Sequence, residues 1–129
     1  MHHRISVITA AALAAAILAP SAAHAAGEPH VVASGLDNPR GVAVGADGTV
    51  YVAEAGRAGS ACLDAETCVG LTAGVTMVKG GKQSKLVTGL LSAGGKDGSF
   101  TVGADGLAIG PGGELYTIMT SAGPELPPL

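Results

Sequence analysis

A hairpin motif that occurs twice, 65 positions apart, restricts the possible folds of this chain more than any other feature. The copies span residues 41–54 and 106–118, and their residue types agree position by position, down to the tyrosines Tyr51 and Tyr116. Each copy has two short apolar runs on either side of a glycine-rich turn, which is the pattern of a β-hairpin. The chain is therefore expected to be all-β, with one structural unit used twice.

Two further strands are expected between the copies. Residues 73–78 and 84–88 are strand-like runs separated by a turn that contains two glycines. Together with strands at 41–44 and 49–54 they make a set of four, which is the layout of a propeller blade. The Gly- and Ser-rich segment 91–103 is expected to cross to the next blade, of which only the first hairpin is present.

The first 25 residues have the pattern of an export signal. A short basic start, which includes His2 and His3, precedes the uncharged run 5–19, and Ala23 and Ala25 are the small residues that a signal peptidase requires. This run is shorter than the ~20 residues that span a bilayer as a helix, so a cleaved signal is expected and no stable membrane span. We expect cleavage after Ala25 and a secreted or extracytoplasmic location.

The predicted fold class is an all-β, incomplete β-propeller of about one and a half four-stranded antiparallel blades after an N-terminal signal peptide. The segments are the signal peptide at 1–25, the partial propeller at 26–122 and a Pro-rich tail at 123–129. Because ~3 or more repeats are usually needed for stability, a monomer of this size is expected to have a low folding stability. Its exposed blade edges are expected to be able to self-associate.

Export determines how the two cysteines are interpreted. Cys62 and Cys68 are the only cysteines, and an isolated pair in an oxidising compartment usually forms a disulfide. Free thiols are the alternative. A zinc site would need about four ligands, and the spacing differs from the C-x-x-C of redox motifs. We therefore predict a structural disulfide, with no metal site.

No catalytic or cofactor-binding constellation is visible, and no cofactor is predicted. Glu54 ends a strand and is interpreted as a loop-capping or solvated carboxylate, with a ligand role as the alternative. Asp47 is assigned to its Asp-Gly turn, Asp97 and Asp105 to loops, and His30 to an exposed position near the mature N-terminus. A net charge of −3 gives no reason to expect nucleic acid as a partner, and other partners are unknown.

Residues 39–54 resemble the NHL-type propeller repeat. More closely, residues 31–122 are similar to the N-terminal part of the ScyD/ScyE family, exported bacterial proteins named after genes linked to synthesis of the pigment scytonemin. The matching points occur in the same order in the sequence: residues 35–41, residues 51–56, Cys62 and Cys68 with Val69-Gly70, residues 74–76 and residues 87–90. The resemblance implies an exported propeller and carries no catalytic residues with it.

Members of this family look several times longer than this chain, which is therefore expected to be an N-terminal fragment or a truncated member. The expected function is a non-catalytic binding or scaffold role. One alternative is a fragment of a metal- or quinone-dependent propeller enzyme acting on sugars or lactones, because similar propellers include such enzymes. The other is a truncated reading frame whose product does not fold.

Overall fold

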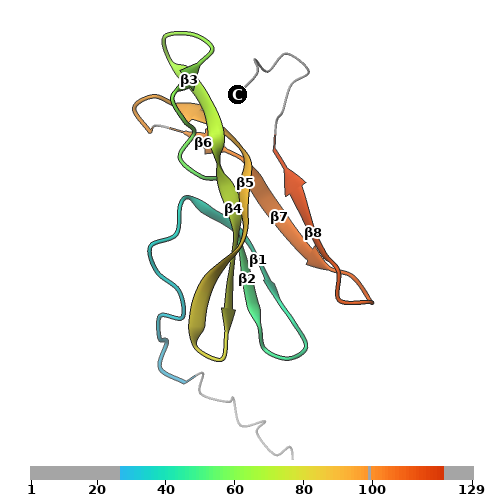
Figure 1. The fold of residues 1–129 in the computed structure, drawn as a ribbon. Coiled ribbons are helices and arrows are strands. Elements are labelled where there is room, and N and C mark those ends of the chain that lie inside the picture. The colour runs from blue at the N-terminus through green and yellow to red at the C-terminus, as the bar shows by residue number, and fades with distance from the viewer. Residues whose placement is uncertain (1–26, 99, 121–129) are drawn as a thin grey trace, which may run out of the picture.

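The computed structural model describes residues 27–98 and 100–120, which form two antiparallel sheets and no helix (Figure 1). The predicted signal peptide at 1–25 and the tail at 123–129 lie outside the described residues. The strands are β1 (Pro39–Val44), β2 (Val50–Glu54), β3 (Ala61–Cys62), β4 (Thr67–Lys79), β5 (Lys82–Gly95), β6 (Thr101–Val102), β7 (Ala104–Ile109) and β8 (Leu115–Met119). The all-β prediction is confirmed for these residues.

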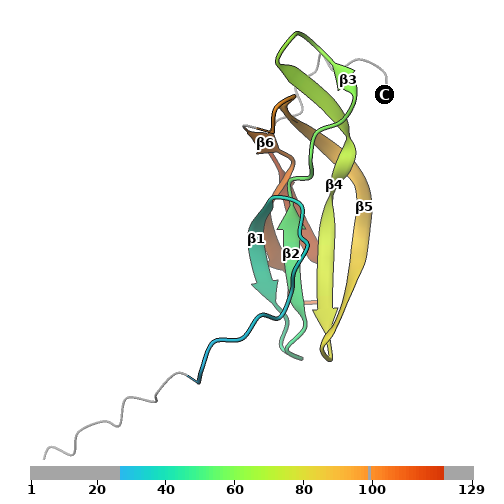
Figure 2. The ribbon, with the colours of Figure 1, turned by 90° about the vertical axis from the view of Figure 1, so that its left-hand side faces the viewer.

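The first sheet has six strands, in the order β1-β2-β4-β5-β6, with β3 paired to β4 beside this path. All four strands that were expected between residues 41 and 88 are present in chain order. Strands β4 and β5 are longer than expected, and their far ends carry β3 and β6 (Figure 2). The second sheet is the β7–β8 hairpin.

The prediction that residues 91–103 simply cross between blades is wrong in detail. Strand β5 continues to Gly95, and β6 returns along it, pairing Val102 with Ala93. Glycine makes this turn possible, because Gly98 has a φ of 76° and a Cβ on Gly94 would lie 2.5 Å from the carbonyl oxygen of Phe100. The chain passes to the second sheet only after β6.

The sequence repeat is also a repeat of structure. The β1–β2 register pairs Val42 with Val52, and the β7–β8 register pairs their counterparts Leu107 and Thr117. The next two pairs of each hairpin correspond in the same way, and both hairpins have an irregularity at the same place near the start of the first strand. The two hairpins therefore match residue by residue with the offset of 65 positions that relates their sequences.

The two turns form the same pair of backbone hydrogen bonds. Gly45 N donates to Thr49 O at 2.8 Å, and Gly48 N donates to Gly45 O at 2.9 Å; the counterparts in the second turn have the same two distances. Gly48 and Gly113 have φ values of 78° and 89°, a conformation that glycine adopts without steric cost. Glycine at these two positions therefore explains why both sequences close their hairpins alike.

Side chains of β1 and β2 alternate between two faces of the first sheet. One face, here called the covered face, is defined by Gly41, Ala43, Tyr51 and Ala53, and β7 packs against it. The opposite face, here called the open face, is defined by Val42, Val44, Val50, Val52 and Glu54. The segment before β1 crosses part of this open face in front of β2 (Figure 2).

The core that results is built from small side chains. Every buried hydrophobic residue in the described part of the chain is alanine, valine or cysteine, with Ala53 and Ala104 fully inaccessible. Thr49, Thr76 and Ser92 are buried beside them. Because buried apolar area sets the hydrophobic contribution, small side chains leave a larger share of the stability to hydrogen bonds and ion pairs.

Gly41→Ala is expected to loosen the packing of β7 on β1, because the added Cβ would lie 2.5 Å from the Asp105 carbonyl oxygen. Overpacking of this kind costs about 1–3 kcal/mol. Gly106→Ala is the matched control at the repeat-related position, where the added Cβ meets only the Ile118 side chain at 3.7 Å. Urea unfolding followed by circular dichroism measures both, and equal losses for the two variants would contradict the packing described here.

Candidate functional site

The carboxylate of Glu54 is the most closely surrounded charged group in the described residues. Glu54 is the last residue of β2 and belongs to the open face, yet only 1% of it is exposed. The β2–β4 and β4–β5 registers place Thr76 and Lys85 opposite one another on that face, beside Glu54. The segment that crosses the face brings the backbone of Asp37 to the same point.

Protein donors occupy both oxygens of this carboxylate. Oε1 accepts hydrogen bonds from the Thr76 hydroxyl and from Lys85 Nζ, the latter at 2.7 Å. Oε2 accepts from the Asp37 backbone N–H and from Lys85 Nζ, both at 2.7 Å. Four contacts fill the roughly four acceptor positions that an ionised carboxylate offers. Glu54 therefore acts as an internal cross-link, and its oxygens have no free position for a ligand.

The environment of Glu54 favours its ionised form. Burial alone would raise its pKa, but the hydrogen bonds from Asp37, Lys85 and Thr76, with the charge of Lys85, outweigh burial and hold the pKa below its usual 4.5. A lowered folded-state pKa stabilises the fold above the unfolded-state pKa, and this contribution is lost as the pH falls through the folded-state value.

A second set of contacts fixes the segment that supplies the Asp37 amide. Arg57 holds the Asp37 carboxylate through Nε at 2.8 Å and Nη2 at 3.0 Å. Asn38, which has a φ of 52°, donates from Nδ2 to Gly56 O at 2.7 Å, and its own carbonyl accepts from Ala55 N at 3.0 Å. The chain before β1 is therefore fastened to the chain directly after β2, next to Glu54.

The other acidic candidates lie on separate elements. Asp47 serves its turn: its carboxylate accepts from Thr49 N at 3.0 Å and Thr49 Oγ1 at 2.9 Å, and these bonds with Lys79 lower its pKa to about 2. Asp105 lies within β7, not in a loop as predicted, and accepts from Thr120 Oγ1 at 2.9 Å. Asp97 lies in the loop between β5 and β6. The structure does not assemble these carboxylates into one site.

Among the described residues, His30 is the only histidine. His30 lies before β1 and is exposed, as predicted. His2 and His3 lie outside the described residues. Within residues 27–98 and 100–120, no three His, Cys, Asp or Glu side chains are grouped so that they could hold a metal ion.

Two hollows open on the surface of the described residues. The smaller, of about 160 Å³, lies where β1 and β7 begin, and Arg40 there donates from Nη2 to Thr101 O at 2.7 Å. It is below the ~300 Å³ at which ligand pockets usually start. The larger, of about 470 Å³, lies between the cysteine loop and the β5–β6 loop, and Glu66, Lys96 and Phe100 line it. It could hold a small polar molecule, but it lacks a nucleophile paired with a base among these residues.

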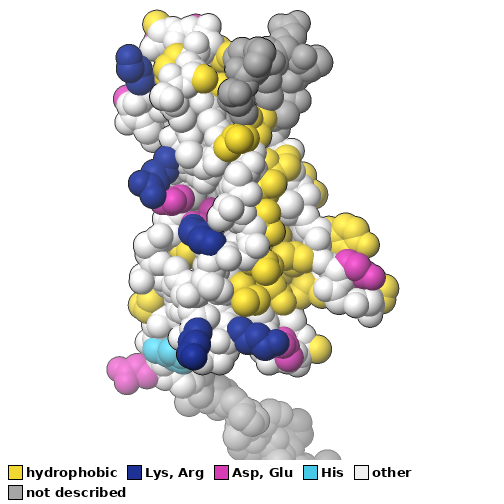
Figure 3. Space-filling view, viewed as in Figure 1, with side chains coloured by type: hydrophobic (Ala, Val, Ile, Leu, Met, Phe, Trp, Pro, Cys, Tyr) yellow, Lys and Arg dark blue, Asp and Glu magenta, His cyan; other side chains and the backbone are white. Residues whose placement is uncertain are grey.

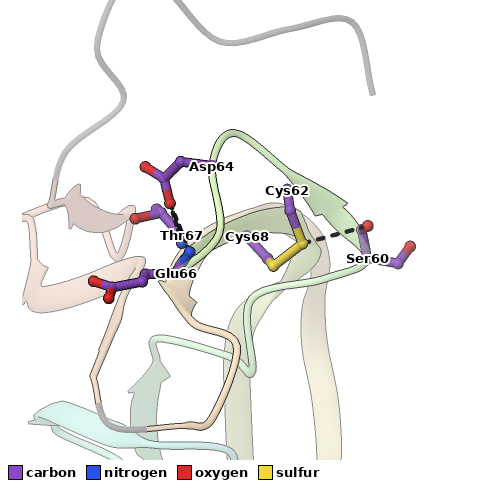
Figure 4. Close-up of a disulfide and its surroundings, with 6 residues drawn as sticks. All are labelled: Ser60, Cys62, Asp64, Glu66, Thr67 and Cys68. Atoms are coloured by element: carbon purple, nitrogen blue, oxygen red, sulfur yellow. Dashed lines mark hydrogen bonds between the residues drawn. A yellow bond between two sulfur atoms is a disulfide. The ribbon is translucent and has the colours of Figure 1, made fainter.

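Cys62 and Cys68 are directly opposite one another in the β3–β4 pair and form a disulfide, with Cα atoms 3.8 Å apart (Figure 4). Asp64 organises the turn that they close, because its Oδ1 accepts hydrogen bonds from Glu66 N at 2.8 Å and Thr67 N at 2.6 Å. These bonds lower the pKa of Asp64. The pair therefore fixes a local turn and does not join distant parts of the chain.

The sequence analysis singled out Glu54 as a loop-capping or solvated carboxylate, but the side chain is buried, and its partners were missed. Thr76 and Lys85 lie in strands that were predicted, and a polar residue within an apolar run was the available signal. Aligning the two strands around their Gly80-Gly81 turn would have placed Thr76 and Lys85 opposite one another. The Asp37 amide has no sequence signal, because a backbone donor is common to every residue except proline.

No protein-family model, curated protein or solved structure matches the chain. Among the residues that the structure describes, no helix is long and apolar enough to cross a membrane.

Glu54→Gln is expected to destabilise the protein at neutral pH by about 2 kcal/mol, because it leaves Lys85 without its anion. The loss stays below that of a fully buried pair because 45% of the Lys85 side chain is exposed. Stability of the wild type should also fall as the pH drops below about 4.5, and the variant should lose less over that range. Urea unfolding at several pH values measures both effects.

Glu66→Gln is the matched control, since it removes the same charge from an exposed loop. We expect it to change the stability by less than about 0.5 kcal/mol. A Glu54→Gln protein with wild-type stability and wild-type acid sensitivity would contradict the role given to this carboxylate.

Proposed function

We propose that this chain is an exported, non-catalytic β-propeller segment of the ScyD/ScyE type that serves in binding or as a scaffold. The observation that carries the proposal is the repeated hairpin. Two units with the same register lie face to face, as neighbouring blades of a propeller do, and β1, β2, β4 and β5 follow one another as the strands of one blade.

The contacts of the acidic side chains support a non-catalytic role over the enzyme alternative. An enzyme acting on sugars or lactones would need carboxylates free to bind a metal ion or to move a proton. Glu54 is occupied by four internal contacts and Asp47 by its own turn. These groups are committed to the fold.

The cysteine pair supports the proposed export. A disulfide persists in an oxidising compartment and is rare in the reducing cytosol. Together with the signal-like pattern of the first 25 residues, the Cys62–Cys68 bond fits a protein that works outside the cytoplasm.

Export makes a direct prediction for the full chain produced in a bacterium. The periplasmic protein should begin at Ala26, and its cysteines should resist alkylation unless a reductant is added first. N-terminal sequencing and mass spectrometry of the alkylated protein measure these properties. Ala25→Arg should block cleavage, with Ala33→Arg as a control placed after the site. Full-length protein in the cytoplasm, with two reactive thiols, would contradict the export proposal.

The absence of catalysis is tested with the same periplasmic protein. We expect no turnover above the protein-free rate with simple lactones in the presence of calcium or zinc, or with aldose sugars and a soluble quinone. Metal-dependent lactone hydrolysis that is lost in Asp105→Asn and kept in Asp64→Asn would establish the enzyme alternative instead. Asp64 is the control because its carboxylate serves the disulfide turn.

A further inference from the structure

The chain exposes two apolar faces that belong to different units of the repeat. On the open face, Val42 and Val44 are 61% and 63% exposed. On the outer side of the second hairpin, Tyr116 and Ile118 are 60% and 71% exposed, and they share that side with Ala108. This second surface is here called the outer face of β7–β8. Side chains this large and this exposed on neighbouring positions mark a surface for association.

The repeat relates these two exposed faces to a contact that the chain already makes. The side of β7–β8 that faces the first sheet carries Leu107, Leu115 and Thr117, all partly buried. Their counterparts in the first hairpin are Val42, Val50 and Val52 of the open face. Hydrophobic side chains gather along the line where β7–β8 meets the first sheet (Figure 3). The open face is therefore the repeat-related equivalent of a surface that is already docked.

The receiving surface has an equivalent as well. The covered face that holds β7 includes Ala43, Tyr51 and Ala53. Their counterparts are Ala108, Tyr116 and Ile118, which form the outer face of β7–β8. One contact of this kind is thus satisfied within the chain. For a second contact, the outer face of β7–β8 is exposed, and so is the part of the open face at Val42 and Val44, whereas Val52 of the open face is only 4% exposed.

Glycines at the point of closest approach allow this second contact. Inside the chain, β1 and β7 approach at Gly41, where a Cβ would lie 3.1 Å from the Cα of Gly106. In the second contact the two residues exchange roles, and Gly106 becomes the position that must lack a side chain. Nothing within the described chain requires glycine there, since a Cβ on Gly106 would meet only Ile118 at 3.7 Å.

We propose that a second copy of this chain docks its open face, centred on Val42 and Val44, onto the outer face of β7–β8, centred on Tyr116 and Ile118. The two surfaces differ, so the association is head to tail and each copy keeps one free half of the contact. Such contacts close into a ring or continue as an open chain. The contact rests on the repeated packing and not on the proposed export or scaffold role, so either can fail without the other.

Two features make the contact between copies differ from the one within the chain: the segment before β1 covers the Glu54 end of the open face, and the position of Gly103 is occupied by another residue. Gly103 lies against the Ala55 carbonyl oxygen, where a Cβ would come within 2.4 Å, and its counterpart in the first unit is Asn38. The strands must therefore separate slightly at this end. We expect a reversible association of moderate strength, centred on the turn ends of the hairpins.

Sedimentation velocity at increasing concentration provides the first measurement, on the purified product of the full chain from whichever cell compartment holds it. The wild type should show a sedimentation coefficient that rises with concentration. Val42→Asp places a charge on the open face, and Ile118→Asp places one on the outer face of β7–β8. Each substitution prevents its face from docking, so each variant alone should remain a monomer. If either variant fails to give the wild-type circular dichroism spectrum, Val44→Asp or Tyr116→Asp replaces it on the same face.

Mixing the two variants provides the decisive measurement. Val42→Asp retains an intact outer face and Ile118→Asp an intact open face, so the mixture should form a one-to-one dimer and no larger species. Leu63→Asp, which changes an exposed apolar residue on the cysteine loop, should associate as the wild type does.

Three results would overturn the proposal. A wild type that stays monomeric at every concentration would show that the faces do not bind one another. A mixture that stays monomeric would show that the contact is not head to tail. Association that survives in Ile118→Asp and is lost only in Val42→Asp would identify a symmetric contact between two open faces instead.

Discussion

Most of the first sheet depends on the contacts that the ionised carboxylate of Glu54 makes. It joins β2 to β4 and β5 through Thr76 and Lys85, and it joins all three to the segment before β1 through the Asp37 amide. A buried carboxylate is costly unless its acceptor positions are filled, and here they are. The core around it consists of alanine, valine and cysteine side chains, so a polar cross-link carries a share of the stability that larger side chains carry in other small domains.

The repeat determines the remainder of the architecture. Two hairpins with the same register present the same alternation of faces, so the packing of one on the other follows from how each is built. The two turns achieve the same backbone geometry with different side chains. In the first, Asp47 accepts from the Thr49 amide, whereas in the second the carboxylate of Glu114 accepts from the Gly112 amide at 3.1 Å. Backbone geometry and positive-φ glycines are therefore the shared elements of the repeat.

The strands could be predicted because their signals are local. Apolar runs around Gly-containing turns located β1, β2, β7 and β8. The same signals located residues 73–78 of β4 and residues 84–88 of β5. The first part of β4, before residue 73, and the last part of β5, after residue 88, could not be predicted. Gly70, Gly94 and Gly95 weaken the apolar pattern there. Glycine there permits other segments to approach closely, with Gly70 lying against the backbone of Gly59 and Gly94 against that of Phe100. The contacts of Glu54 join residues that are 17 to 31 positions apart. They form only when β2, β4 and β5 pair in the observed register, which no single segment of the sequence indicates.

The position of the disulfide has a consequence for how the chain oxidises and folds. Its two cysteines are six residues apart, face one another across a short hairpin, and are the only cysteines in the chain. A chain with one such pair has no wrong intramolecular pairing to correct, so its oxidation needs an electron acceptor but no reshuffling of bonds. Neither sulfur takes part in the contacts of Glu54 or in the packing of the two hairpins. These parts of the molecule can therefore assemble whether the cysteine pair is reduced or oxidised. Oxidation of the pair therefore completes one loop at the periphery, apart from the strand pairing around Glu54.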